Sequence, residues 1–395
     1  MTIALYGGSF NPPHLGHAEA AQTVYEELRP DILYIVPDNV PPHKDMEEGA
    51  PTAEQRLALC RLAFADIPNA VVSDMEIRRE GRSYTADTVR LLREQHPEDE
   101  LFLVMGTDML LCFDDWYQYE YLLQTCTLAV LSRDDDQELA LLEKKRELEE
   151  KHGAKIRLLA HTPLVMSSSE IRERLRLRLR AGLLDDKVYS SIIQNGFYDA
   201  LPELSWLREK AYAYLEPERI AHVVGCESEA VMLAKTWGED PDNAATAGIL
   251  HDITKRWKGE EQLNLCRKYG IVCDEAEEKN TSILHARTGA AMAKELFHIS
   301  DEIQSAIRWH TTGKPDMTTL EKIVYLADFI EPTRDFPGLD ELRKLAYKDL
   351  NGAMALALSL CMGDLRRRNK DVYKDTLDAY RWYCEESDPG SIQGG

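Results

Sequence analysis

The sequence lacks any long apolar segment. No window of its 395 residues approaches the roughly 18 consecutive apolar residues that a membrane-spanning helix needs, so we expect no membrane span. The first residues, Met1–Gly8, also lack the basic segment and the apolar run of a signal peptide. On this basis we expect a cytoplasmic protein.

An excess of positive charge is missing as well. The chain has 47 Lys and Arg against 69 Asp and Glu, which gives a formal net charge of -22. Proteins that neutralise nucleic-acid phosphates or anionic membrane surfaces need clustered Lys and Arg. We therefore expect neither a nucleic acid nor a membrane as a partner, and the sequence leaves homo-oligomerisation open.

Closely spaced cysteine pairs are also absent. The eight cysteines include no Cys-x-x-Cys motif, and such scattered residues are typical of reduced proteins. We interpret them as core or neutral surface residues. Hydrophobic residues make up 44% and charged residues 29%, as in ordinary globular proteins, and the length suggests two or three domains.

The first half of the chain alternates short apolar runs with amphipathic segments. Strand-like runs lie at Thr2–Tyr6, Ile32–Val36, Ala70–Ser73, Leu101–Met105, Leu128–Ser132 and Ile156–Leu159. Helical patterns lie between and after them, at His17–Leu28, Pro51–Phe64, Thr85–Gln95, Asp134–His152 and Ser168–Arg180. This alternation predicts a Rossmann-like α/β domain with a parallel sheet over residues 1–198.

The second half reads as all-helical. From Leu204 onward long amphipathic segments follow one another without a convincing strand, and they end with a long segment at Ala346–Arg368. We therefore predict a helical bundle over residues 199–386 and a flexible Gly/Ser-rich tail over 387–395. Gly196 is placed to cap the last helix of the first domain.

The strongest local signal is the string GGSFNPPHLGH at Gly7–His17, directly after the first expected strand. Glycines at such a turn let backbone N–H groups approach a phosphate, and a helix N-terminus favours an anion. His14 and His17 lie three residues apart at the start of a helix, so both can face one substrate. Gly16 between them leaves room for a nucleobase or ribose.

This string resembles the mark of the nucleotidylyltransferase superfamily, and the whole first half is similar to bacterial nicotinate mononucleotide adenylyltransferases. Further matching pieces are Val36-Pro37, Pro41–Lys44, Arg56-Leu57, Ser83–Thr88, Gly106–Asp108, Trp116, Arg133 and Ser167–Arg172. Ser169 departs from the pattern, because the family usually has Thr there. Both residues offer a hydroxyl group.

The resemblance implies adenylyl transfer from ATP to nicotinate mononucleotide, with Mg²⁺ and release of pyrophosphate, as a step of NAD biosynthesis. It assigns His14 and His17 to the ATP phosphates, and Lys44 and Arg172 to the triphosphate and the departing pyrophosphate. The residues implied to bind ATP are Gly7, Gly8, Ser9, Phe10, His14, Gly16, His17, Ser167, Ser168, Ser169 and Arg172.

On the acceptor side the resemblance points to Thr85, Asp108 and Trp116, together with Lys44. An indole can stack on a pyridine ring, but Trp116 is also compatible with a half-buried core position. Asp108 follows a strand, where α/β sheets bind ligands, and a helix N-cap is its alternative. Phosphopantetheine or nicotinamide mononucleotide remain alternative acceptors.

The helical half carries a second set of candidate residues. They are His222, His251, Asp252, His285, His310 and Asp328. Helices that each deliver a ligand into one bundle core can build a dinuclear metal site. The set resembles the HD phosphohydrolase superfamily, with Asp252 as a bridging carboxylate. His298 matches no motif, and we interpret it as a capped or core histidine and not as a ligand.

The residues around these ligands are similar to bacterial HD proteins that hydrolyse diadenosine tetraphosphate symmetrically to two ADP. The resemblance implies a catalytic Asp252 and two transition-metal ions; it favours iron, and manganese remains open. Candidates for the polyphosphate are Lys255, Arg308, Thr311 and Arg334. The Lys and Arg residues are equally compatible with surface salt bridges. A domain that only senses a nucleotide is the alternative function.

Overall fold

The computed structural model describes residues 1–395 except 42–48, 80, 133–137, 162–166, 181 and 385–395. Lys44, Arg133 and the predicted tail lie outside the described residues. The chain divides into two compact units, Met1–Leu201 and Pro202–Gly395. Among the described residues, no helix combines the length and apolar character that a membrane crossing requires.

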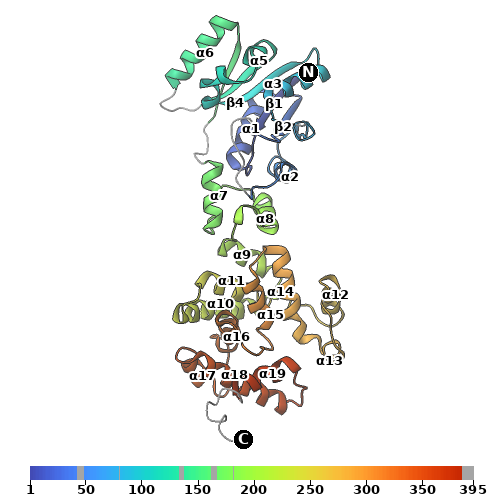
Figure 1. Cartoon of the computed structure of the whole chain (residues 1–395), viewed down its shortest axis with the longest axis vertical. Coiled ribbons are helices and arrows are strands. Elements are labelled where there is room, and N and C mark those ends of the chain that lie inside the picture. The colour runs from blue at the N-terminus through green and yellow to red at the C-terminus, as the bar shows by residue number, and fades with distance from the viewer. Residues whose placement is uncertain (42–48, 80, 133–137, 162–166, 181, 385–395) are drawn as a thin grey trace. The chain divides into compact units, whose positions relative to one another are not determined.

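The first unit is built on a six-stranded parallel sheet (Figure 1). The strands are β1 (Thr2–Gly8), β2 (Ile32–Pro37), β3 (Ala70–Val72), β4 (Glu100–Gly106), β5 (Thr127–Ser132) and β6 (Lys155–Ala160), in the order β3-β2-β1-β4-β5-β6. The Rossmann-like prediction is confirmed. The strand order reverses between β1 and β4, which is where open α/β sheets bind ligands.

Helices connect these strands, and two more follow the last strand. The connecting helices are α1 (Leu15–Leu28), α2 (Ala53–Ala63), α3 (Thr85–Gln95), α4 (Thr107–Leu111), α5 (Tyr119–Thr125) and α6 (Glu138–His152), and those after β6 are α7 (Ser168–Arg176) and α8 (Asp186–Asn195). Gly196 ends α8 with a φ of 65°, as expected of a glycine cap. The prediction that α7 extends to Arg180 is wrong, because Arg178 adopts a left-handed φ of 59° and the chain turns.

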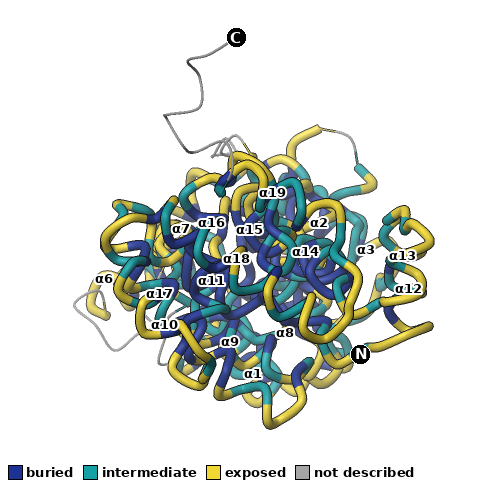
Figure 2. Tube along the Cα trace, turned by 90° about the horizontal axis from the view of Figure 1, so that it is seen from below, coloured by how far each residue is buried: buried dark blue, intermediate teal, exposed yellow. Residues whose placement is uncertain are grey.

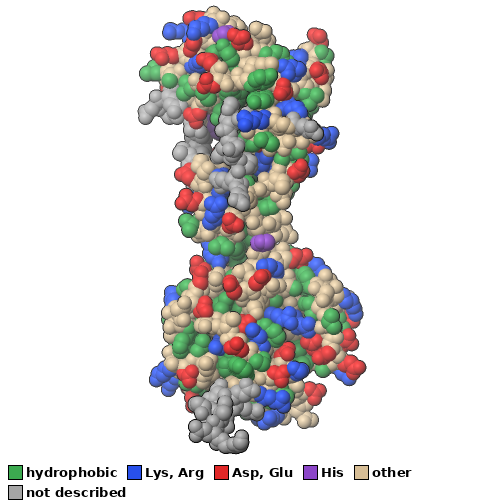
Figure 3. Space-filling view, viewed as in Figure 1, with side chains coloured by type: hydrophobic (Ala, Val, Ile, Leu, Met, Phe, Trp, Pro, Cys, Tyr) green, Lys and Arg blue, Asp and Glu red, His purple; other side chains and the backbone are tan. Residues whose placement is uncertain are grey.

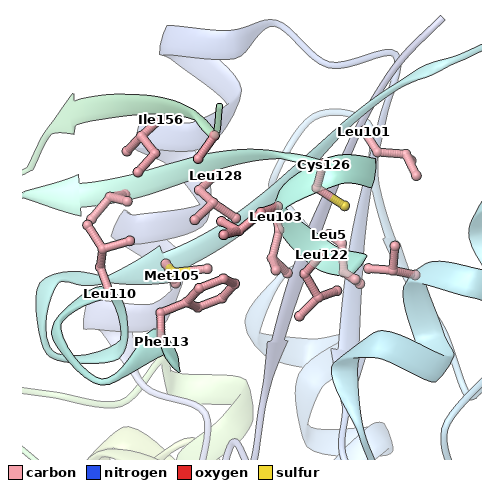
Figure 4. Close-up of a cluster of buried hydrophobic side chains, with 14 of the residues drawn as sticks. Leu5, Leu101, Leu103, Met105, Leu110, Phe113, Leu122, Cys126, Leu128 and Ile156 are labelled. Atoms are coloured by element: carbon pink, nitrogen blue, oxygen red, sulfur yellow. The ribbon is translucent and has the colours of Figure 1, made fainter. Parts of the chain in front are cut away.

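Alternate residues of the strands pack on opposite faces of the sheet. Leu5, Leu103 and Met105 belong to one buried cluster, which Figure 4 shows together with side chains from α4 and α5. Ala4 and Val104 belong to the cluster on the other face. Both faces are therefore apolar, which is why the strands read as continuous apolar runs in the sequence.

The second unit contains only helices among its described residues, and the predicted bundle is confirmed. The helices are α9 (Leu204–Tyr212), α10 (Pro217–Trp237), α11 (Pro241–Leu250), α12 (Glu260–Lys268), α13 (Glu275–Lys279), α14 (Leu284–Phe297), α15 (Asp301–Trp309), α16 (Thr319–Ile330), α17 (Leu339–Ala346), α18 (Leu350–Arg367) and α19 (Lys374–Cys384). Figure 2 shows α11 and α16 largely buried. Acidic and basic side chains are interspersed over the face seen in Figure 3.

The helix predicted at Ala346–Arg368 is wrong at its start. Ala346 ends α17, and α18 begins four residues later at Leu350, where the Asp349 side chain accepts a hydrogen bond from Gly352 N–H. An aspartate N-cap therefore separates two helices that share apolar periodicity. His298 is exposed and is the C-cap residue of α14, with a left-handed φ of 48°, so the core interpretation of this residue is wrong.

Candidate functional sites

In the first unit, the two histidines of the glycine-rich string lie at the N-terminus of α1. His14 is the N-cap residue, and its backbone N–H lies 3.2 Å from Nδ1 of His17. The two ring centroids are 3.7 Å apart. Burial lowers the pKa of His14 to about 4 and that of His17 to about 3, so both rings are neutral near pH 7.

The loop before His14 is held by a buried arginine on α2. Arg56 is 1% exposed, and its Nη1 donates to the Ser9 carbonyl at 2.6 Å and to Oδ1 of Asp38 at 2.9 Å. Ser9 Oγ donates to Oδ2 of the same carboxylate at 2.8 Å. The ends of β1 and β2 are thereby tied together. Arg56 is one of the residues that carry the family resemblance, but the sequence did not predict this role for it.

The N-terminal turn of α7 meets the same loop. Arg172 is buried, and it donates to the Asn11 carbonyl at 2.8 Å and to Ser169 Oγ at 3.2 Å. Ser168 Oγ lies 3.4 Å from the Pro12 carbonyl oxygen. Ser167 caps the helix, because its side chain accepts from the N–H of Glu170. The structure therefore brings the predicted serines and Arg172 to the glycine-rich string.

A cavity of about 380 Å³ opens beside this loop, at the carboxyl ends of β1 and β4. Its walls include Gly7, Gly8, Ser9, Thr85 and Trp116. Trp116 also packs against the sheet core, so both interpretations of this residue describe part of its surroundings. His14, His17 and Arg172 lie outside the cavity lining among the described residues.

Asp108 does not line the cavity either. It is exposed and occupies the first turn of α4, whose N-cap is Gly106, so the N-cap alternative for Asp108 is wrong. A carboxyl group that we did not predict does line the cavity. Glu76 is 7% exposed and accepts a hydrogen bond from Thr88 Oγ1 at 2.5 Å, and burial raises its pKa.

In the second unit, four histidine rings converge on one buried carboxylate. Oδ2 of Asp252 lies 3.4 Å from Nε2 of His251 and 3.7 Å from that of His222. Its Oδ1 lies 3.2 Å from Nε2 of His285 and 3.7 Å from that of His310. Asp252 therefore presents one oxygen to each pair of histidines.

The sixth predicted residue joins one side of this cluster. Asp328 Oδ1 lies 3.1 Å from Nε2 of His222. Two groups of ligand atoms lie within metal-binding range, one formed by His222, His251 and Asp328 and the other by His251, Asp252 and His310. Oδ1 of Asp252 is buried and accepts no hydrogen bond from the described residues. The two groups share His251, and this donor set has the chemistry to hold a divalent cation.

The outer ring nitrogens fix how the four histidines point. Nδ1 of His222 lies 2.9 Å from Oε1 of Glu331, a carboxylate with no solvent exposure. The other Nδ1 atoms contact main-chain carbonyls: His251 with Gly248, His285 with Ser282 and His310 with Ile307, at 2.8, 2.6 and 2.6 Å. Each Nε2 is therefore aimed into the cluster, as in protein metal centres.

The ionisation of the cluster suits a metal at its carboxylates and at His285, but not at His251. Burial opposes the charge on His251, but Cys226 and Asp252 raise the pKa of its ring well above the ordinary value. Burial opposes the charge on Asp252, but the neighbouring histidines, His251 first, hold the pKa of its carboxyl well below the ordinary range. A hydrogen bond from His222 acts in the same direction on the pKa of Asp328. Burial lowers the pKa of His285 to about 4. Ionised carboxylates and neutral imidazoles are the forms that bind cations.

Three of the four predicted polyphosphate residues lie at this cluster. Lys255 Nζ is 3.0 Å from Nε2 of His285, and Thr311 Oγ1 is 3.2 Å from the same atom. Arg334 Nη2 lies 2.5 Å from Oδ1 of Asp328. Arg308 differs, because it is exposed and lies over the ring of Trp309 at 4.9 Å; none of its described contacts reaches the ligands.

Comparisons with known proteins match both halves of the chain. Residues 5–174 match the cytidylyltransferase-like family, and residues 219–333 match the HD domain. A probable nicotinate-nucleotide adenylyltransferase of Lachnoclostridium phytofermentans is 35% identical over 198 residues, which cover 50% of this chain and 98% of that relative. The chain belongs to the nicotinate-nucleotide adenylyltransferase family and carries an HD domain.

Two further similar proteins are described as hydrolases. The symmetrical bis(5'-nucleosyl)-tetraphosphatase of Bacillus subtilis is 38% identical over 185 residues, 46% of this chain and 99% of that relative. A crystal structure described as a predicted HD superfamily hydrolase involved in NAD metabolism, from Clostridium acetobutylicum, is 32% identical with a TM-score of 0.45. It covers 47% of this chain and 98% of that one.

Two residues of the HD domain contact the ligands although we did not predict them. Arg219 Nε donates to Oδ2 of Asp252 at 2.6 Å, and Glu331 contacts His222 as described. Arg219 lies three residues before His222, and thus on the same face of α10, which is a usable signal. Glu331 belongs to the string that resembled the family, where its role as a partner of a ligand was not evident.

Proposed function

We propose that the first unit transfers the adenylyl group of ATP to nicotinate mononucleotide and releases pyrophosphate. The observation that carries this proposal is the juxtaposition of the neutral pair His14 and His17 at a helix N-terminus with a cavity at the switch point of the sheet. The Lachnoclostridium phytofermentans relative, named as a probable nicotinate-nucleotide adenylyltransferase, supports the same reaction. Its product would be nicotinate adenine dinucleotide, and the reaction would be a step in NAD biosynthesis.

The reaction needs positioning and charge stabilisation more than covalent catalysis. The acceptor phosphate attacks the α-phosphorus of ATP in line, and pyrophosphate leaves. The imidazoles of His14 and His17 and the first N–H groups of α1 donate to phosphate oxygens. Lys44 and Arg172 hold the leaving group, and Mg²⁺ arrives with ATP. Thr85 and Trp116 line the cavity that would take the nicotinate end.

The test is an acceptor comparison with the full chain. ATP and Mg²⁺ are incubated in turn with nicotinate mononucleotide, nicotinamide mononucleotide and phosphopantetheine, and the products and pyrophosphate are quantified. We expect dinucleotide from nicotinate mononucleotide at the highest rate. Equal rates with the two pyridine mononucleotides would remove the acid specificity, and transfer to phosphopantetheine alone would replace the proposed acceptor.

For the HD domain we infer a dinuclear hydrolase that cleaves diadenosine tetraphosphate symmetrically into two ADP. The observation that carries it is Asp252, whose two oxygens each face a pair of histidines. The bound cations would be held by His222, His251, Asp252, His285, His310 and Asp328. They would supply positive charge to the reacting phosphate, while Lys255, Thr311, Arg219 and Arg334 would contact the remaining polyphosphate.

Elemental analysis of the purified protein, combined with an activity screen over dinucleoside polyphosphates, tests this proposal. We expect about two transition-metal ions per chain, iron or manganese, and two ADP from diadenosine tetraphosphate. Cleavage to ATP and AMP would contradict symmetrical hydrolysis. If nucleotide binds but no metal supports hydrolysis, the domain is a sensor instead.

A further inference from the structure

The end of the first unit contains an unusual run of backbone conformations. Gly196, Tyr198 and Asp199 have φ values of 65°, 64° and 53°. Left-handed conformations are uncommon for residues other than glycine, and two in succession need surrounding contacts that hold them in place. The run ends at Asp199, two residues before the first unit ends at Leu201.

The contact that holds this segment reaches the glycine-rich string. The Tyr198 hydroxyl donates to Oδ1 of Asn11 at 2.8 Å, across 187 positions of sequence. Tyr198 is 3% exposed and Asn11 is 8% exposed. Burial also raises the pKa of Tyr198, so its hydroxyl keeps its proton and remains a donor. The backbone N–H of Leu201 further ties the segment to Leu175 of α7, at 3.0 Å.

Asn11 lies at a point of the string that needs support. The preceding residue, Phe10, is itself left-handed with a φ of 44°. Arg56 holds the Ser9 carbonyl on one side, and Arg172 holds the Asn11 carbonyl on the other. The tyrosine is the described partner of the Asn11 side chain. His14, the N-cap residue of α1, follows three residues later. The position of Asn11 therefore affects where His14 is placed.

We propose that Tyr198 is a positioning residue for adenylyl transfer, which acts through Asn11 on the loop that presents His14 and His17 to ATP. The inference rests on the proposed function of the first unit. The segment that leads into the HD domain then supports the loop of the nucleotide site, and is not only a connection between two units.

The test is a Tyr198→Phe variant of the full chain, which removes the hydroxyl and keeps the buried ring. We expect the KM for ATP to rise about three- to tenfold, the range that corresponds to one lost hydrogen bond. The KM for nicotinate mononucleotide should stay unchanged, because Tyr198 does not line the cavity with Thr85 and Trp116. If Tyr198 had only a structural role, the KM values for the two substrates would change together.

Tyr25→Phe on α1 is the matched control. Tyr25 is half-buried beneath Arg29, and its hydroxyl makes no hydrogen bond among the described residues. We expect both KM values of this variant to equal those of the wild type. Asn11→Ala removes the same hydrogen bond from its other side, and it alone should raise the KM for ATP if Tyr198→Phe folds poorly. Where both variants fold, the double variant should raise this KM no further than either single one.

Calorimetric titration with a non-hydrolysable ATP analogue separates this inference from the proposed function. A wild type that makes no dinucleotide refutes the proposed reaction, but weaker analogue binding by Tyr198→Phe would still support the positioning role. An active wild type whose KM for ATP is unchanged in Tyr198→Phe overturns the inference. A parallel rise of both KM values overturns it as well.

Discussion

The pair formed by His222 and Glu331 distinguishes one metal ligand from the others. Nδ1 of this histidine faces a buried carboxylate, whereas the other three rings face main-chain carbonyls. A carboxylate makes the imidazole a better electron donor. Gly225 leaves room for this arrangement, because a Cβ there would lie 2.6 Å from Oε2 of Glu331.

We predict that Glu331→Gln lowers metal affinity about 10- to 100-fold, because the amide keeps the shape but not the charge. Metal retained after dialysis against graded chelator concentrations measures the effect. Glu321→Gln is the matched control: this carboxylate is also buried and lies on α16, the helix that Glu331 follows, but it contacts Ser305 and Lys314 instead of a ligand. Equal retention by the two variants would contradict the orienting role.

The neutral pair His14 and His17 predicts a pH dependence of stability. Their folded pKa values, about 4 and about 3, lie below the unfolded value of 6.5. Between these limits the unfolded chain binds more protons, so stability is fully present above about pH 6.5 and falls as the pH decreases. The two residues therefore destabilise the fold in acid.

This dependence is measurable as the decrease in the urea concentration at the unfolding midpoint when the pH is lowered from 7 to 5. We expect the double variant His14→Gln/His17→Gln to lose less than the wild type does. Other titrating groups contribute equally to both proteins and cancel in the difference. If both proteins lose the same amount, the histidines are not held neutral by burial.

Candidate residues could be predicted from the sequence where their motif and spacing indicate their chemistry. The six candidate ligands and the pair His14 and His17 were named from motifs, and the structure brings each set together. The sequence did not predict the roles of Arg56, Arg219 or Glu331. Each of these is a charged residue whose partner is distant in sequence, and spacing carries no information about such contacts.

At the scale of elements, the strands were the most predictable part of the fold. Parallel strands covered on both faces are continuous apolar runs, and all six were located. The short helices α4 and α5 were not, because five and seven residues are too few to display a helical period. The end of α7 was missed because a left-handed Arg178 has no sequence signature.

The crossing of α10 and α11 depends on a glycine. A Cβ on Gly248 would lie 2.8 Å from the Cα of Glu227, which is backbone and cannot move aside alone. We predict that Gly248→Ala destabilises the HD unit by about 1–3 kcal/mol, although alanine favours a helix. Its carbonyl also orients His251, so metal content should fall.

Gly363→Ala on α18 is the control for this substitution. Nothing lies within 4 Å of the added Cβ, so the higher helix propensity of alanine should leave stability unchanged or increase it. Thermal unfolding and elemental analysis of both variants give the comparison. If Gly248→Ala is as stable as Gly363→Ala, the two helices are not in the close contact described here.

At the scale of the whole molecule, an acidic chain carries two sites that suit highly anionic nucleotides. The net charge of -22 is a sum over the whole chain and says little about local charge. In the HD unit Arg219, Lys255 and Arg334 lie around the ligand cluster, and in the first unit Arg56 and Arg172 lie behind the glycine-rich string. Positive side chains are therefore concentrated near both candidate sites, although the chain as a whole is acidic.

Each unit has its own core and its own candidate site, so our central claim is that the chain holds two independent activities. The most direct test measures adenylyl transfer and diadenosine tetraphosphate hydrolysis in the wild type, in His17→Ala and in Asp252→Ala. We predict that His17→Ala loses about 10²- to 10³-fold in dinucleotide synthesis and keeps hydrolysis, because a donor to the transferring phosphate is removed. Asp252→Ala should lose hydrolysis and keep synthesis. If either substitution silences both activities in a folded protein, the two sites are not independent.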